Sequence, residues 1–157
     1  MSVSISVTAH QINTIDTTVA ERTIGEWLTT VRDYEQALTF DLEFPREPGD
    51  PRELSEIPEI RLWFIRLDAQ YPWLPFLLDW KAGELARYTA MLVPHQFHPK
   101  DGIQFNPEAL EIFVMQRCFI LLNWLKQQGI EGRSRVKAMA QMLGYELDDG
   151  FFDVLEV

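Results

Sequence analysis

Alternating apolar and polar residues predict two β-strands in the first third of the chain. In residues 3–7 serines separate three aliphatic residues, and in residues 38–44 large apolar side chains occupy every second position. Successive residues of a strand point to opposite faces of a sheet, so a period of two is typical of a half-buried strand. Between the two strands, the apolar positions favour a helix that begins at a threonine near residue 17 and continues to about residue 32.

Apolar residues at steps of three and four predict three further helices. The first covers about residues 54–71 and ends before Pro72, because proline disfavours helical geometry in the residue that precedes it. The second covers residues 106–128, between an asparagine that caps its start and a glycine that ends it. Apolar side chains cover most of the circumference of this second helix, so we expect it to be covered on more than one side. A short third helix follows over about residues 134–143.

The stretch YPWLPFLLDW, residues 71–80, is the most apolar and aromatic part of the chain. Together with the β-favouring residues that follow it, this stretch predicts a β-hairpin in which Pro75 lies in an edge strand or at a bulge. A helix over residues 83–92 is the main alternative, since the apolar positions there also fit helical spacing. We expect the stretch to belong mainly to the core, with one end able to present Trp73 or Trp80 to another protein.

The order of these elements predicts an α+β fold. We expect a two-layer domain in which helices pack on one face of a small, mainly antiparallel sheet. The chain of 157 residues fits one domain over residues 1–157. Residues 45–53 contain three prolines and five charged residues, which predicts a flexible loop inside this domain.

Charge and composition exclude several classes of function. Acidic residues number 24 and basic residues 14, for a net charge of −10, so no basic face for a nucleic-acid backbone is visible. No uncharged apolar run approaches the length of about 20 residues that a membrane-spanning helix needs. The first residues resemble neither a signal peptide nor a transit peptide.

Cys118 is the single cysteine, which excludes an intrachain disulfide and suits a reducing compartment. One cysteine also cannot build a Cys-ligated zinc site or iron–sulfur cluster, so we expect no resident cofactor. Its place on the apolar stripe of the long helix favours a buried structural thiol over a nucleophile.

Two polar clusters could carry chemistry. His95 and His98 lie three residues apart between prolines, and two imidazoles could ligate a metal, although zinc sites need further ligands. Surface histidines in a loop are the simpler interpretation. The acidic segment that contains Asp148 and Asp149 lacks the spacing of a calcium loop, so it is either a solvated tail or a contact for a basic partner. The sequence contains no nucleophile elbow and no phosphate-binding glycine loop.

Three longer blocks resemble the chlororespiratory reduction six family of cyanobacteria and chloroplasts. They are EIRLWFIRLDAQYPWLPFLLDWKAGELARYTAMLVPHQF, GIQFNPEALEIFVMQRCFILLNWLKQQ and SRVKAMAQMLGYELDDGFFDVL, within residues 54–155. The resemblance implies a non-catalytic assembly factor for the photosynthetic NAD(P)H dehydrogenase-like complex. Its partner would be the immature iron–sulfur subunit of the connecting arm. Plant relatives act in the stroma, so the resemblance, together with the absence of a transit peptide here, implies a cyanobacterial, cytoplasmic protein. The resemblance supplies no catalytic residue.

An assembly factor needs a surface of aromatic and polar side chains that holds its partner. The sequence offers such residues at the ends of predicted loops and of the predicted hairpin. The partner-binding residues that we predict are Trp73, Trp80, Pro94, His95, Gln96, Phe97, Gln104, Tyr145, Asp148, Asp149 and Phe151. Two other functions remain as alternatives. One is a metal-dependent enzyme or processing factor that uses His95 and His98, and the other is a peripheral membrane protein anchored by the segment from Trp73 to Trp80.

Overall fold

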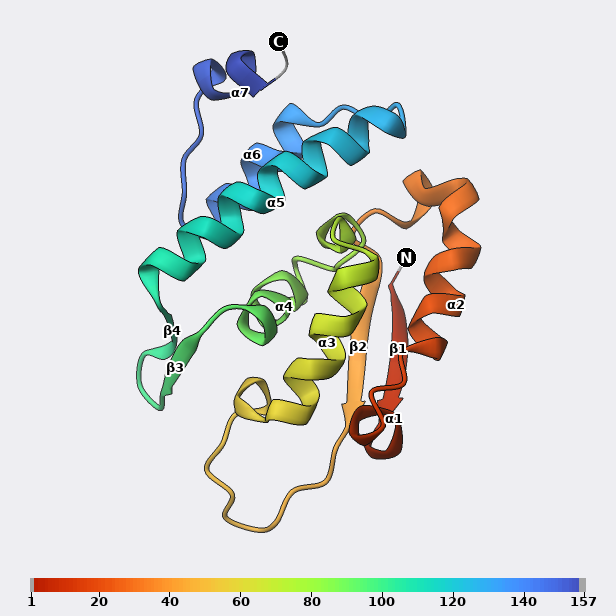
Figure 1. Cartoon of the computed structure of the whole chain (residues 1–157), viewed down its shortest axis with the longest axis vertical. Helices are drawn as coiled ribbons and strands as arrows, with labels where there is room; N and C mark the ends of the chain where they lie inside the picture. The colour runs from red at the N-terminus through yellow and green to blue at the C-terminus, as the bar shows by residue number, and fades with distance from the viewer. Residues whose placement is uncertain (1, 156–157) are drawn as a thin grey trace. The chain divides into compact units, whose positions relative to one another are not determined.

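A computed structural model describes residues 2–155 of the chain. It divides the chain into two compact units, Met1–Asn106 and Pro107–Val157. The first unit contains the elements β1 (Val3–Thr8), α1 (Ala9–Asn13), α2 (Thr18–Trp27), β2 (Leu38–Glu43), α3 (Pro58–Gln70), α4 (Glu84–Leu92), β3 (His95–His98) and β4 (Gly102–Phe105). The second unit contains α5 (Pro107–Gln127), α6 (Arg133–Met142) and α7 (Asp149–Leu155) (Figure 1). In the described residues no helix is long and apolar enough to cross a membrane.

Strands β1 and β2 form a parallel pair whose register runs from Val3 beside Leu38 to Thr8 beside Glu43. Both strands have one buried and one exposed face, as the alternation in the sequence predicts. In β1 the side chains of Ile5 and Val7 are buried, whereas those of Ser4 and Ser6 are exposed. Helices therefore cover one face of this pair, and α2 and α3 lie beside it (Figure 1).

An aromatic cluster fills the core of the first unit. Phe40 of β2 meets Trp63 and Phe64 of α3 edge to face, with ring centroids 5.8 and 5.2 Å apart. Phe64 in turn meets Tyr88 of α4 at 6.1 Å. The Trp63 indole N–H donates a hydrogen bond of 2.8 Å to the backbone carbonyl of Asp16, so this large ring is buried with its polar atom satisfied.

The stretch at residues 71–80 forms core, as expected, but the predicted hairpin is wrong. The six side chains from Trp73 to Leu78 are buried, and a 3₁₀ turn covers Leu74–Phe76. Residues 84–92 form helix α4, the alternative that the sequence left open. Gly83 begins this helix with a φ of +84°, a backbone conformation that favours glycine. The β-favouring residues of α4 face the core at helical spacing, so packing overrides their intrinsic preference.

The outer edge of β2 is closed by two different devices. At Leu38, the backbone pairs with residues 77–79. The Leu38 N–H donates to the Leu77 carbonyl at 2.7 Å, and the Leu38 carbonyl accepts from the Asp79 N–H at 2.8 Å. Two residues further on, side chains of α4 replace a strand. The Arg87 guanidinium donates a 2.6 Å hydrogen bond to the Phe40 carbonyl, and the Glu84 carboxylate accepts one from the Phe40 N–H.

Glu84 is a buried carboxylate, 7% exposed, and its nearest charged partner is Arg87. Burial raises the pKa of Glu84 above its ordinary value of 4.5, and Arg87 and the Phe40 N–H oppose that rise. We expect Glu84→Ala to cost about 1–3 kcal/mol of unfolding free energy, because the Phe40 N–H and Arg87 both lose a partner. Glu59→Ala is the matched control, since Glu59 also lies in a first helical turn but is exposed. An equal loss in both variants would contradict the proposed edge closure.

The raised pKa of Glu84 predicts that the stability of the protein depends on pH. Below pH 4.5 Glu84 is protonated in the folded and the unfolded chain, so its stabilising contribution is fully present. That contribution is lost as the pH rises through the raised pKa of the folded state, because the buried group must then ionise. Relative to Glu84→Gln, the parent protein should lose stability as the pH rises above 4.5, as measured by urea midpoints. A difference that moves in the opposite direction would show that burial does not dominate at this site.

In the second unit, α5 spans the predicted helix and Gly129 ends it with a φ of +69°. Cys118 on this helix is fully buried, as predicted for a structural thiol. Helix α7 lies against α5 and α6: Phe151 is 6.4 Å from the Phe119 ring, and Arg133 of α6 forms a 2.9 Å ion pair with Asp153. Helix α6 begins one residue before the predicted start, and Gly132 occupies the cap position.

The α+β class is confirmed. Within residues 2–155, however, the strands form two separate pairs instead of one mainly antiparallel sheet, and the longer pair is parallel. The sequence could not give this division, because the residues expected to supply antiparallel partners form α4.

Candidate protein-binding surface

A short antiparallel hairpin gathers five of the predicted partner-binding residues. Strands β3 and β4 pair in the register His95 with Phe105, Gln96 with Gln104, Phe97 with Ile103 and His98 with Gly102. Gly102 has a φ of +74°, which turns the chain into β4. We call residues 94–97 and 103–105 the hairpin surface.

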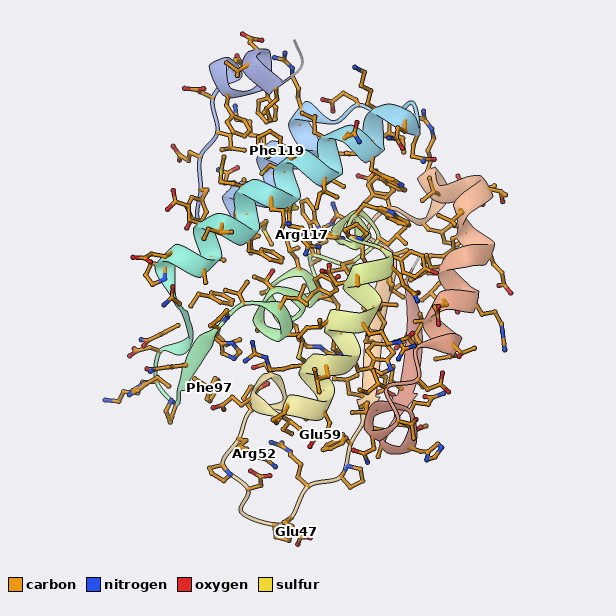
Figure 2. All side chains as sticks on the ribbon, in the orientation of Figure 1. Glu47, Arg52, Glu59, Phe97, Arg117 and Phe119 are labelled. Carbon is orange, nitrogen blue, oxygen red and sulfur yellow. The ribbon has the colours of Figure 1, made fainter. Side chains whose placement is uncertain are left out.

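Each face of this hairpin has its own chemistry, because cross-strand partners lie on the same face. One face carries the mainly apolar side chains, which are His95, Phe97, Ile103 and Phe105. The other face carries the amides of Gln96 and Gln104, which are both exposed. Phe97 is 39% exposed (Figure 2), so an aromatic ring stands in solvent beside polar groups, as at the centre of many protein interfaces.

His95 attaches the hairpin to the rest of the first unit. Its Nδ1 lies 3.0 Å from the Val93 carbonyl, and its Nε2 lies 2.9 Å from the hydroxyl of Ser55, which is buried. A carbonyl only accepts, so Nδ1 carries a proton, which leaves Nε2 to accept from the Ser55 hydroxyl. His95 therefore has a structural role that the sequence does not reveal, because its partner is 40 residues away.

The same geometry does not favour a metal site at His95 and His98. A spacing of three in a strand puts the two rings on opposite faces. A metal at His95 would also displace a hydrogen bond from one of its ring nitrogens. His98 lies 3.4 Å from Asp101 at the turn. Across residues 2–155 no group of three or more His, Cys, Asp or Glu side chains is placed to hold a metal ion.

The backbone of the hairpin adds a second kind of contact. The Asn106 N–H donates a 2.9 Å hydrogen bond to the Pro94 carbonyl. This bond shows which residues of the two strands are hydrogen-bonded to each other. Hydrogen-bonded and non-hydrogen-bonded pairs alternate in an antiparallel ladder. The residues that direct their backbone N–H and C=O groups outward are therefore His95, Phe97, Ile103 and Phe105. Such edges can add an extended segment of another protein as a further strand.

A hollow of about 370 Å³ lies at the base of the hairpin. It is lined by Pro94, His95, Gln96, Gln104, Phe105 and Asn106. Four of these six residues are predicted partner-binding residues. The structure thus brings together the predicted residues of this region and gives them a concave surface.

The two predicted tryptophans are placed differently. Trp73 is buried, 9% exposed, and meets the Tyr71 ring at 5.7 Å. Trp80 is half-buried and donates a 2.9 Å hydrogen bond from its indole to the Pro75 carbonyl. Neither indole is exposed as a partner contact or a membrane anchor would require, so their predicted contact role gains no support from their positions.

The other four predicted residues lie in the second unit, in and before α7. Asp148 and Asp149 are exposed, and Tyr145 and Phe151 are half-buried. Asp148 accepts a 2.9 Å hydrogen bond from the Phe151 N–H, so it stabilises the first turn of α7. A second hollow, of about 420 Å³, is lined by Lys137, Gln141, Glu146, Leu147 and Asp148.

Sequence reasoning missed Ile103, Phe105 and Ser55 at this surface. The segment HPKDG, residues 98–102, has the composition of a turn and lies between QF and IQF, so the flanking alternation could have indicated the hairpin and its apolar face. No local signal could have found Ser55, because its contact with His95 depends on the fold.

Comparison with known proteins places the chain in a family. No solved structure matches it. A family model described as chlororespiratory reduction 6 matches residues 7–154, nearly the whole chain. Members of this family are assembly factors linked to the NAD(P)H dehydrogenase-like complex, and an assembly factor has protein partners. The chain therefore belongs to the chlororespiratory reduction 6 family.

Proposed function

We propose that this protein is a non-catalytic assembly factor that binds the immature iron–sulfur subunit of the connecting arm of the photosynthetic NAD(P)H dehydrogenase-like complex. The family match over residues 7–154 carries the proposal. As part of it, the protein acts in the cyanobacterial cytoplasm, and the single cysteine fits such a reducing compartment.

The hairpin surface is the first contact in this proposal. Phe97 supplies an exposed ring, Gln96 and Gln104 supply amides, and the strand edges supply backbone donors and acceptors. An extended segment of the subunit would pair with one edge and place an apolar side chain beside Phe97. Such pairing needs no reaction, which fits a factor that holds its partner only until assembly.

The acidic segment from Tyr145 to Phe151 is the second proposed contact. Asp148 and Asp149 are exposed, and the whole chain carries a net charge of −10. A basic surface on the subunit would be attracted to this segment, and rim charges of this kind mainly raise the rate of association.

Tagged protein is expected to co-purify with the iron–sulfur subunit. Phe97→Ala should reduce the amount of recovered subunit about tenfold, because exposed aromatic anchors dominate many interfaces. Leu28→Ala is the matched control, since Leu28 lies in the same unit and is 42% exposed against 39% for Phe97. The readout is quantitative mass spectrometry of the recovered complex.

Complementation tests the function itself. A deletion strain should fail to accumulate the complex, and the Leu28→Ala variant, but not Phe97→Ala, should restore it. Normal accumulation of the complex after deletion would refute the proposed function. Equal recovery of the subunit by both variants would refute the contact at Phe97.

A further inference from the structure

A second apolar stripe runs along the exposed side of α5. Ile112 is 70% exposed, and Met115 and Leu122 are half-buried. Phe119, labelled in Figure 2, is 52% exposed although its ring lies 6.4 Å from that of Phe151. These four residues follow one another at steps of three and four, so they share one face of the helix. An apolar face of this length on a soluble protein marks an interaction surface.

Charged residues of opposite sign continue the stripe at its two ends. Glu108 lies four residues before Ile112, and Lys126 lies four residues after Leu122, and both are exposed. With these ends included, the steps alternate between four and three, which is the heptad spacing of a two-stranded coiled coil. We call these six residues the α5 stripe.

The spacing of residues in the α5 stripe is the same when counted from either end. Its six residues form three pairs, and each pair is centred on position 117. The matching pairs are Glu108 with Lys126, Ile112 with Leu122 and Met115 with Phe119. We propose that two copies of this chain pair through the stripe as a two-fold symmetric dimer, with the two α5 helices antiparallel.

The charges determine the direction of this pairing. In the antiparallel dimer, Glu108 of each copy faces Lys126 of the partner subunit, so symmetry gives one ion pair at each end. A parallel pair would place Glu108 against a second Glu108 and Lys126 against a second Lys126. Like charges opposite each other repel, so the parallel arrangement is disfavoured.

A hollow of about 500 Å³ in the second unit lies where a second copy would insert a side chain. Its walls are Phe119, Leu122, Asn123, Lys126, Ile130, Gly132 and Leu155. The symmetry places Ile112 of the partner subunit opposite Leu122, beside this hollow. The most exposed apolar residue of the α5 stripe would thus enter the recess next to it, as a knob enters a hole.

The full chain should form a concentration-dependent dimer in solution. Sedimentation equilibrium from about 1 μM to about 1 mM should show a mass that rises from 18.3 kDa toward twice that value. One helix pair buries less than the standard interface of about 1,600 Å², so we expect a dissociation constant in the micromolar range. A monomer throughout this range would overturn the proposal.

Ile112→Ser removes the knob, and because Ile112 is 70% exposed the folded subunit should not be affected. We expect the dissociation constant to rise at least about tenfold. Met142→Ser is the matched control, since Met142 lies in the same unit and is 56% exposed on α6. A dimer that Ile112→Ser does not weaken would overturn the proposal.

A charge swap tests the symmetry directly. Glu108→Lys alone and Lys126→Glu alone each create two repulsive contacts, so each should weaken the dimer about tenfold. The double variant exchanges the two charges and should restore the affinity of the parent chain. A double variant as weak as the single variants would contradict the predicted pairing.

Orientation follows from one label distance. Spin labels on Gln127→Cys would have their backbones about 30 Å apart in the antiparallel dimer but about 10 Å apart in a parallel one. The short distance would refute the antiparallel arrangement. If the chain stays monomeric and Ile112→Ser instead lowers recovery of the iron–sulfur subunit, the stripe binds a helix of another protein and the dimer is refuted.

Discussion

Trp63→Ala is expected to destabilise the first unit by about 3–5 kcal/mol. The Trp63 side chain is 0% exposed and meets the rings of Phe40 and Phe64 at 5.8 and 5.0 Å. Its removal would leave a cavity beside both rings and would leave the Asp16 carbonyl without its 2.8 Å hydrogen bond. The cost is large because the cluster joins β2, α3 and α4, so no single element can close the cavity by moving alone.

Chemical denaturation followed by circular dichroism measures this loss. Leu62→Ala is the control, because Leu62 is the preceding residue on the same helix and is 49% exposed. It should change the unfolding free energy by less than about 0.5 kcal/mol. A loss below about 1 kcal/mol for Trp63→Ala would mean that the aromatic cluster is not the centre of the core.

The Cys118 thiol is expected to react about 100-fold more slowly in the folded protein than in the unfolded chain at about pH 8. Burial raises the pKa of Cys118 from 9.0 to about 11, and only the thiolate reacts. The two-unit rise accounts for the factor of 100, and the fully buried position of the sulfur adds steric protection.

Reaction with an aromatic disulfide reagent, followed by absorbance, measures this rate. Gln127→Cys provides an exposed reference thiol on the same helix, and denaturant should bring Cys118 to the reference rate. The stability contribution of the thiol is fully present below pH 9 and is lost between pH 9 and about 11, where only the unfolded chain releases its proton. Rapid reaction of Cys118 in the folded protein would contradict its burial.

A protonated, buried thiol bears on the proposed function. Iron–sulfur clusters are held by thiolates, and a thiol with a pKa of about 11 is a poor ligand at neutral pH. Under the proposed function, the protein would therefore bind its partner through surfaces such as the hairpin surface and not through the cluster.

Periodicity in the sequence predicted β1, β2, α3 and α5, because each has one clear repeat. It failed at α4, where β-favouring residues lie at spacing that fits both structures. Only the core contacts of Tyr88 and its neighbours decide between them, and those contacts come from elements distant in the chain.

The candidate site was also predicted only in part, because some of its contacts come from residues distant in the chain. The aromatic and amide residues of the hairpin surface stand out in the sequence, and the structure brings them together. The sequence could not distinguish the exposed Phe97 from the buried Trp73, since both are aromatic residues near prolines. The symmetry of the α5 stripe was present in the sequence, but it gains meaning only when Ile112 and Phe119 are known to be exposed.

The closure of β2 by Glu84 and Arg87 has a consequence for how the chain folds. Before α4 docks, Phe40 presents an unpaired N–H and C=O on a strand that also carries large apolar side chains. Such an edge can nucleate intermolecular sheets while synthesis continues. About 40 residues separate Phe40 from α4, so the ribosome releases β2 well before it releases the helix that covers the β2 edge. The exposed acids Asp41 and Glu43 would then repel other nascent chains until the helix arrives.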